Sequence, residues 1–118
     1  MKILLLDIET APNKVYTWDM WNQNISSDKM IDSSYVMCWA AKWLGKHPIR
    51  FAAEWKEGKD AMLHQIHALL DEADVVVHYN GTKFDIPILN REFVKLGLTP
   101  PSPYKQVDLY RVVRQNFK

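Results

Sequence analysis

The sequence feature that most constrains this chain is a short apolar run near its amino terminus. Residues 3–8 read Ile-Leu-Leu-Leu-Asp-Ile, with Lys2 before them and Glu9 after them. A run of this length, predominantly apolar and bounded by charge, is typical of a central strand that is buried on both faces of a sheet. We therefore expect a sheet with residues 3–8 at its centre and other elements packed around it.

Two further strands follow after a connection without regular periodicity. Residues 11–32 mix Pro, Asn and Asp and predict an irregular connection. Residues 35–44 and 49–55 predict two strands, and Gly-Lys-His-Pro at 45–48 predicts the turn between them. These segments are expected to form an antiparallel hairpin. Its tryptophans are expected in the core: Trp39, Trp43 and Trp55.

The second half of the chain alternates between helical and extended patterns. Residues 59–73 place apolar side chains at the three-and-four spacing of an amphipathic helix, and residues 75–79 predict a strand. Residues 86–96 predict another helix, with Pro87 in its first turn. A helix, a strand and a helix in succession imply a crossover packed on a sheet, so the expected fold class is α/β with a mixed sheet.

The last segment has one apolar and one basic side. Residues 109–118 predict a helix with Leu109, Val112, Val113 and Phe117 on the apolar side and Arg111, Arg114 and Lys118 on the basic side. No Gly or Pro ends this helix, and its apolar side needs a cover. These features favour truncation of the domain at its carboxyl end, and they suggest as a hypothesis that the helix pairs with a second copy of the chain.

Size and composition fit one globular domain spanning residues 1–118. Apolar residues make up 47% of the chain and charged residues 25%, which disfavours a disordered or fibrous protein. The amino-terminal run is too short for a signal peptide or a membrane span, and the single Cys38 cannot form an internal disulfide. These observations predict a cytoplasmic protein without membrane contact, in which Cys38 is a buried strand thiol.

Two carboxylates mark the end of the first predicted strand. Asp7 and Glu9 stand two residues apart and therefore project from the same face. Two acids so close repel each other, whereas a divalent cation between them removes that penalty. A metal site is one interpretation of this pattern. The structural alternative is a strand end at which the acids reach solvent or cap the following turn.

A second polar cluster follows the strand predicted at residues 75–79. It reads Asn80-Gly81-Thr82-Lys83-Phe84-Asp85 and lies directly before a predicted helix. If the two strands are neighbours, Asp85 joins Asp7 and Glu9, because sites in such sheets gather where strand ends open a crevice. Asn80 would then orient the acid or contact a phosphate, and Phe84 would pack beneath the site. The alternative for Asp85 is an acid that interacts with the helix dipole.

In this order, Asp-Ile-Glu-Thr followed by Asn-x-x-x-Phe-Asp resembles the first two exonuclease motifs of the DEDD (DnaQ-like) superfamily, which has the ribonuclease H-like fold. The segments 39–45, 73–80 and 107–109 are also similar to the exonuclease domain of family B DNA polymerases and its predicted phage and bacterial relatives. The resemblance covers nearly the whole chain. It implies that residues 1–118 are the amino-terminal part of an exonuclease domain.

The resemblance also implies a reaction and a set of site residues. Asp7, Glu9 and Asp85 correspond to three ligands of two divalent ions, Mg²⁺ or Mn²⁺, and Ile8, Thr10, Asn80 and Phe84 to substrate contacts. The implied reaction is hydrolytic removal of nucleotides from a 3′ end, with single-stranded DNA as the expected substrate and RNA as the alternative. A polymerase or helicase is an expected partner.

The sequence departs from the pattern of this superfamily at the third motif, which is a Tyr or His followed by an Asp on a late helix. Tyr104-Lys105-Gln106-Val107-Asp108 matches it literally, with a helix opened by Ser102-Pro103, yet it follows Asp85 closely. We favour the other reading, in which Asp108 is an aspartate at a strand end and the third motif lies beyond Lys118.

Three functions thus remain. The first is an exonuclease whose site is completed elsewhere or by Asp108, and the second is a non-catalytic module that binds nucleic acid or protein. The third is an endonuclease or resolvase on the same fold. Two further surfaces suit single-stranded nucleic acid, namely the loop tryptophans Trp18 and Trp21 and the basic side of the last helix. The favoured alternatives are that the tryptophans cover the core and that the basic side is a solvated face.

Overall fold

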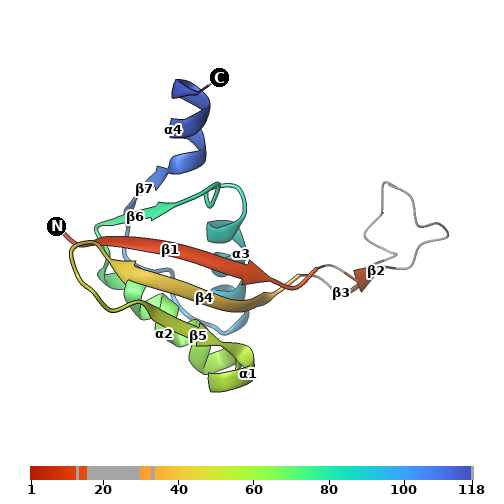
Figure 1. The fold of residues 1–118 in the computed structure, drawn as a ribbon. Helices are drawn as coiled ribbons and strands as arrows, with labels where there is room; N and C mark the ends of the chain where they lie inside the picture. The colour runs from red at the N-terminus through yellow and green to blue at the C-terminus, as the bar shows by residue number, and fades with distance from the viewer. Residues whose placement is uncertain (13, 16–29, 33, 118) are drawn as a thin grey trace.

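The computed structural model describes residues 1–12, 14–15, 30–32 and 34–117 (Figure 1). Most of the connection predicted at residues 11–32, including Trp18 and Trp21, lies outside the described residues. Within it, the short strands β2 (Lys14–Val15) and β3 (Met30–Asp32) pair antiparallel in a separate two-stranded sheet.

The main sheet has five strands in the order β5-β4-β1-β6-β7. Strand β1 (Ile3–Thr10) pairs antiparallel with β4 (Val36–Trp43), which pairs antiparallel with β5 (Arg50–Ala53). On the other side, β1 pairs parallel with β6 (Val75–His78), and β6 pairs parallel with β7 (Lys105–Asp108). The mixed α/β sheet predicted from the sequence is therefore confirmed, with β1 at its centre.

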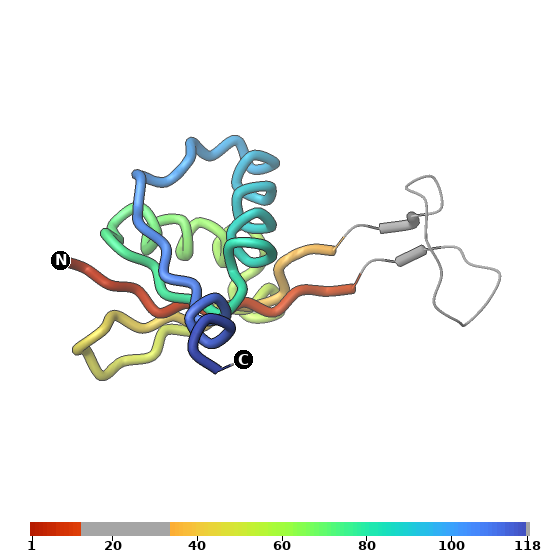
Figure 2. Tube along the Cα trace, turned by 90° about the horizontal axis from the view of Figure 1, so that it is seen from above, coloured from red at the N-terminus to blue at the C-terminus, as the bar shows by residue number. Residues whose placement is uncertain are grey.

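Four helices accompany the sheet in the described ranges: α1 (Glu54–Glu57), α2 (Lys59–Glu72), α3 (Asp85–Lys95) and α4 (Leu109–Asn116). Both α2 and α3 lie on one side of the sheet (Figure 2). The predicted amphipathic stripe of α2 is buried in full: Met62, Leu63, Ile66, Leu69 and Leu70. The crossover from helix to strand to helix is thus confirmed, because α2 and α3 flank β6 in the chain and share one face.

Burial along β1 corrects one prediction. Leu4, Leu6 and Ile8 are buried in the same core cluster as the apolar residues of α2 and α3, whereas Leu5 is only partly buried and Asp7 is exposed. Alternate side chains of a strand point to opposite faces, so β1 is buried on one face only. The prediction that both faces are buried was wrong because Ile3 and Leu5 lie on the opposite face. None of the described helices packs on that face as α2 and α3 do on the other.

The predicted end of the second hairpin strand and the predicted burial of Trp55 are wrong. The strand expected over residues 49–55 ends at Ala53, and Trp55 lies in α1 with 64% of its surface exposed. Trp39 is buried as predicted, and its indole N–H donates to the backbone oxygen of Met62 at 2.9 Å. The helix considered for Ser102 to Asp108 is absent, because residues 105–108 form β7.

Helix α3 is fixed in place by a buried carboxylate. Glu92 is 1% exposed and lies 3.4 Å from the Lys59 ammonium group of α2 and 3.2 Å from the Arg91 guanidinium group. Arg91 also donates to the backbone oxygen of Ser34. A buried acid without a partner would be costly, so these contacts favour one position for α3. The first residue of that helix is Asp85.

The helix α4 has the predicted amphipathic pattern but no buried residue. It projects from the end of β7, away from the helices that cover the sheet (Figures 1 and 2). Leu109, Val112 and Val113 each leave about two fifths of their surface exposed, at 43%, 43% and 41%. In the part of the chain that the structure describes, no helix has the length and hydropathy needed to cross a membrane.

Candidate active site

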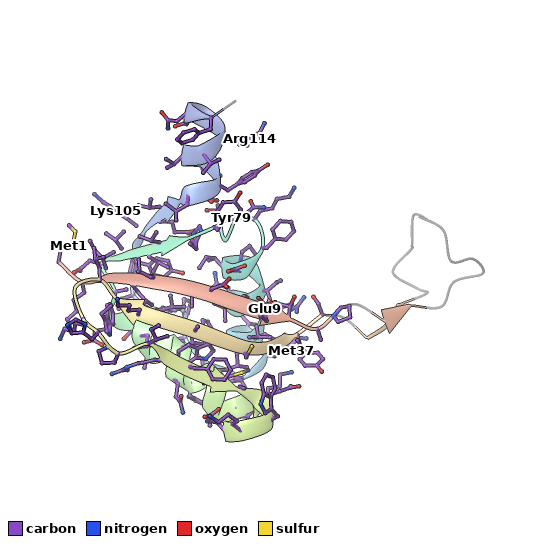
Figure 3. The ribbon with its side chains drawn as sticks, viewed as in Figure 1. Met1, Glu9, Met37, Tyr79, Lys105 and Arg114 are labelled. Carbon is purple, nitrogen blue, oxygen red and sulfur yellow. The ribbon has the colours of Figure 1, made fainter. Side chains whose placement is uncertain are left out.

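Asp7 and Glu9 lie at the carboxyl end of β1, and both side chains are exposed. Their register partners on β4 are Ala40 and Cys38. Because alternate residues share one side of a strand, both carboxylates belong to the face that α2 and α3 leave open. Figure 3 shows Glu9 toward the end of β1, beyond the part of the strand that pairs with β6.

Asp85 reaches this strand end from α3. Its carboxylate accepts a hydrogen bond from the backbone N–H of Ile8, which lies between Asp7 and Glu9. The pKa of Asp85 is raised from 3.8 to about 6, chiefly by burial and then by the charges of Asp7 and Glu9. His78 and the Ile8 hydrogen bond act in the opposite direction without cancelling this effect. The parallel pairing of β1 with β6 thus brings the acids from both motifs near one another.

The donor chemistry of these residues suits a hard divalent cation. Asp7, Glu9 and Asp85 offer only carboxylate oxygens, and their mutual repulsion is what a bound cation would relieve. Among the described residues, however, no group of three or more His, Cys, Asp or Glu side chains is close enough together to hold a metal ion. The three acids are therefore neighbours that do not form a closed ligand set.

The turn after β6 is built around a buried histidine. His78 is 2% exposed, its Nδ1 accepts from the Gly81 N–H at 3.0 Å, and its Nε2 lies 2.8 Å from Gln106 Oε1. Thr82 donates its hydroxyl proton to the same oxygen at 3.1 Å. Because Nδ1 accepts a hydrogen bond, Nε2 carries the ring proton and donates it in a hydrogen bond to Gln106 Oε1. This network ties the turn before Asp85 to β7.

Gly81 is required by this packing. A Cβ atom at Gly81 would lie 2.5 Å from Cγ of His78, a distance that no real side chain tolerates. Asn80 precedes it with a φ of 57°, in the left-handed region that Asn adopts more readily than most residues. The pair Asn80-Gly81 therefore sets the direction in which the chain leaves β6 and enters α3.

Asp108 closes the same turn from β7. Its Oδ1 accepts from the backbone N–H of Asn80 at 2.7 Å and from that of Tyr110 at 3.0 Å. Burial by itself would raise the pKa of Asp108, but these hydrogen bonds, His78 and Arg111 together lower it. The strand-end reading of Asp108 is confirmed, and the literal third motif is wrong because Tyr104 and Asp108 share no helix.

The predicted substrate contacts fall in different environments. Ile8 is buried and offers only its backbone, Thr10 is partly exposed at the end of β1, and Asn80 is partly exposed. Phe84 was expected to pack beneath the site, but half of its surface is exposed, at 50%. That packing prediction is wrong, while substrate contact by these residues stays a prediction.

Some residues around the site carry no recognisable signal in the sequence. Gln106 and Gly81 complete the His78 network, but a lone Gln on an unrecognised strand gives no indication of such a role. Cys38 was expected to be fully buried, yet it is only partly buried beside Glu9. Burial and the charges of Glu9 and Asp7 raise the pKa of the Cys38 thiol, which keeps it protonated.

Comparison with known families identifies the class to which this fold and site belong. The chain matches the family model of the RNase H superfamily over residues 4–118 and therefore belongs to that superfamily. Membership supports a nuclease function in general terms, and nucleases with this fold generally use divalent metal ions. The ribonuclease H-like fold expected from the sequence is thus confirmed.

One solved structure with this fold is the family B DNA polymerase from the hyperthermophilic archaeon Pyrobaculum calidifontis. It matches with a TM-score of 0.67 at 18% sequence identity, over 98% of this chain. The matched region is 16% of the polymerase chain, so the likeness concerns the fold of one part of that protein. A search of curated proteins gave no match.

Proposed function

We propose that this chain is a metal-dependent 3′-to-5′ exonuclease domain of the DEDD type. The observation that carries the proposal is the meeting of Asp7, Glu9 and Asp85 at the end of the central strand, within an RNase H superfamily domain. The substrate would be the 3′ end of single-stranded DNA, with RNA as the alternative.

The three acids would hold two divalent ions, Mg²⁺ or Mn²⁺. Once bound, such ions would activate water for attack on the phosphodiester and stabilise the departing oxygen. The chain itself contributes position and charge. Asp7 and Glu9 come from a strand fixed by hydrogen bonds on both sides, and Asp85 is held by the Ile8 N–H at the start of a helix anchored through Glu92.

Protonation of Asp85 gives this site a pH dependence of its own. With its pKa raised to about 6, this carboxyl is partly protonated in mildly acidic solution when no cation is bound. A cation must displace that proton, so metal affinity should rise as pH increases through 6 and level off above it. The described residues supply no further free acid here, because the Asp108 carboxylate is already held by Asn80 and Tyr110.

The test is Mn²⁺-dependent digestion of a 5′-labelled single-stranded oligonucleotide, which yields a ladder if nucleotides leave from the 3′ end. Asp7→Ala is the inactive variant. Asp60→Ala, which removes an exposed acid in the first turn of α2, is the matched control. A ladder from the parent and the control, with none from Asp7→Ala, supports the proposal. Cleavage of closed circular DNA would indicate an endonuclease instead.

A second candidate is a non-catalytic module that binds nucleic acid or protein. The observation in its favour is that no three potential metal ligands among the described residues form a closed group. Unchanged melting temperature with added Mn²⁺, together with no ladder from the parent chain, would favour this candidate. A polymerase or helicase partner and a dimer through α4 also remain proposals, the latter to be tested by light scattering.

A further inference from the structure

A hollow lined by several charged side chains lies beside the candidate active site, between the turn after β6 and helix α4. Its volume is about 650 Å³. Two short stretches of the chain, one from each side, form its walls. They contribute Asn80, Thr82, Lys83, Asp108, Tyr110, Arg111, Arg114 and Gln115. We call this hollow the α4 groove.

The charge of the α4 groove is positive. Lys83, Arg111 and Arg114 are exposed, and none of the three forms an ion pair with another described residue. The acid in the lining is Asp108, which is buried and directs Oδ1 at the backbone N–H groups of Asn80 and Tyr110. Its charge is therefore largely engaged within the protein. The charge of Arg111 also acts on Asp108, but all three cationic side chains are exposed to a ligand of opposite charge.

Aromatic rings accompany these cations. Tyr79 is 60% exposed and meets Tyr110 edge to face, with ring centroids 5.6 Å apart. The Arg114 guanidinium lies 5.6 Å from the centre of the Tyr110 ring, and the Lys83 ammonium lies 5.5 Å from that of Phe84. Cations interleaved with exposed aromatic rings suit a chain that carries phosphates and unpaired bases, since each base offers a face on which a ring can stack.

Tyr79 connects the α4 groove with the first of the carboxylates. It is the chain neighbour of Asn80, which lines the groove, and it lines a separate hollow of about 570 Å³ together with Asp7 and His78. Val77 of β6 is the register partner of Leu5, so Tyr79 follows β6 at the level of Asp7 on β1. A polymer bound along the groove would therefore reach the acids at one end.

We propose that the α4 groove binds the single-stranded polynucleotide whose 3′ end enters the carboxylate site. Lys83, Arg111 and Arg114 contact its phosphates, and Tyr79 stacks on a base. The inference deepens the proposed function and rests on it for the polarity of the strand. Single strands fit better than duplex, because paired bases offer no free face to Tyr79.

The experiment measures binding without catalysis. A fluorescein-labelled twelve-nucleotide thymidine oligomer is titrated with the chain in EDTA at several salt concentrations. The test variant combines Lys83→Gln, Arg111→Gln and Arg114→Gln. The control variant combines Lys46→Gln, Arg50→Gln and Lys56→Gln, which removes the same charge from exposed positions around β5. Circular dichroism establishes that both variants fold.

We expect the test variant to bind at least about tenfold more weakly than the parent and the control variant to bind within about twofold. The slope of log affinity against log salt should fall by about 2, since each phosphate contact on a single strand contributes about 0.7. Tyr79→Leu should weaken binding about tenfold with an unchanged slope, because stacking releases no counterions. A parallel titration with an RNA oligomer of the same length compares the affinity of the groove for ribose and deoxyribose strands.

Equal losses in the two triple variants would overturn the inference, as would tighter binding of a duplex of the same length. Both results are independent of nuclease activity. If the groove binds single strands but Mn²⁺ gives no digestion, the proposed function fails while the binding site stands. If digestion occurs and the test variant binds like the parent, the exonuclease stands and the strand follows another path.

Discussion

The two faces of the main sheet differ in what they do, although the same strands supply both. On the covered face, Leu4, Leu6 and Ile8 pack under α2 and α3 and are at most 7% exposed. On the open face, Asp7 and Glu9 are exposed. A strand alternates its side chains with a period of two, so one segment of β1 can stabilise the fold and present acids at the same time.

This difference separates stability from chemistry in the molecule. Burial on the covered face supplies most of the hydrophobic free energy of folding. Where Asp85 of α3 meets the acids of the open face, its burial and then the charges of Asp7 and Glu9 raise its pKa, so this arrangement carries a free-energy cost. Substitutions on the two faces should therefore affect different quantities. Those on the covered face change the free energy of unfolding, and those at the acids change activity.

The largest expected effect concerns the open face. Asp7→Ala should lower the rate of Mn²⁺-dependent digestion by about a thousandfold or more, because the ion loses a ligand shared with the reacting phosphate. Its melting temperature without metal should stay within a few degrees of the parent, since Asp7 is exposed. Digestion at the parental rate by Asp7→Ala would remove this residue from the site.

On the covered face, Leu63→Ala should lower the free energy of unfolding by about 3 kcal/mol. Leu63 of α2 is fully buried at 0% exposure, so truncation leaves a cavity beneath the sheet. Urea denaturation followed by circular dichroism measures the change. A loss below about 1 kcal/mol would mean that this face is loosely packed and that the contrast between the faces is weaker than described.

The turn between β6 and α3 should also be sensitive to substitution, measured as a change in the free energy of unfolding. Gly81→Ala should destabilise the chain by about 2 kcal/mol, because the added methyl group would lie 2.5 Å from Cγ of the buried His78. The control is Gly97→Ala, where nothing lies within 4 Å but φ is +73°, so backbone strain alone acts. Unchanged stability of Gly81→Ala would show that the His78 network can shift freely.

Substitution of Asp85 should raise the free energy of unfolding, whereas the substitutions of Leu63 and Gly81 lower it. The folded chain holds a proton on Asp85 up to a pKa of about 6, against 3.8 ordinarily, so the stability of the parent should fall as pH rises from 4 to 6. Asp85→Asn removes this cost and should stabilise the chain at pH 7 by about 1 kcal/mol, a figure reduced because the side chain is only half buried.

Thermal melts at pH 4 and pH 7 measure this change, with Asp60→Asn as the control. Stabilisation that is equal at both pH values would contradict the electrostatic cause. Added Mn²⁺ should raise the melting temperature of the parent and not that of Asp85→Asn, because the variant lacks one of the proposed ligands.

The smallest change in the free energy of unfolding is expected for a substitution on the open face, away from the acids. Val107 of β7 is 40% exposed, and Val107→Thr keeps its shape and its preference for a strand. The free energy of unfolding should change by less than about 0.5 kcal/mol. A loss comparable to that of Leu63→Ala in the same urea experiment would mean that this face is covered in solution, for example by a second copy of the chain.

Local patterns along the chain predict much of this arrangement. The three-and-four spacing identified α2 and its whole buried stripe, because helical periodicity follows directly from the positions of apolar residues. The acids at the end of β1 were found in the same way, from local order along the chain. The end of β7 at Asp108 was expected only from the resemblance, because Lys105, Gln106 and Val107 are exposed and show no alternation between buried and open positions.

The sequence by itself determined which residues are candidates: a central strand ending in Asp7 and Glu9, and a turn that delivers Asp85 to a helix start. These are local properties of composition and spacing. Only the tertiary structure decided that β6 lies parallel to β1, that Asp108 is held by the turn, and that the α4 groove opens beside the acids. Pairing between distant segments depends on how all faces are buried together, and no single segment of the sequence encodes that balance.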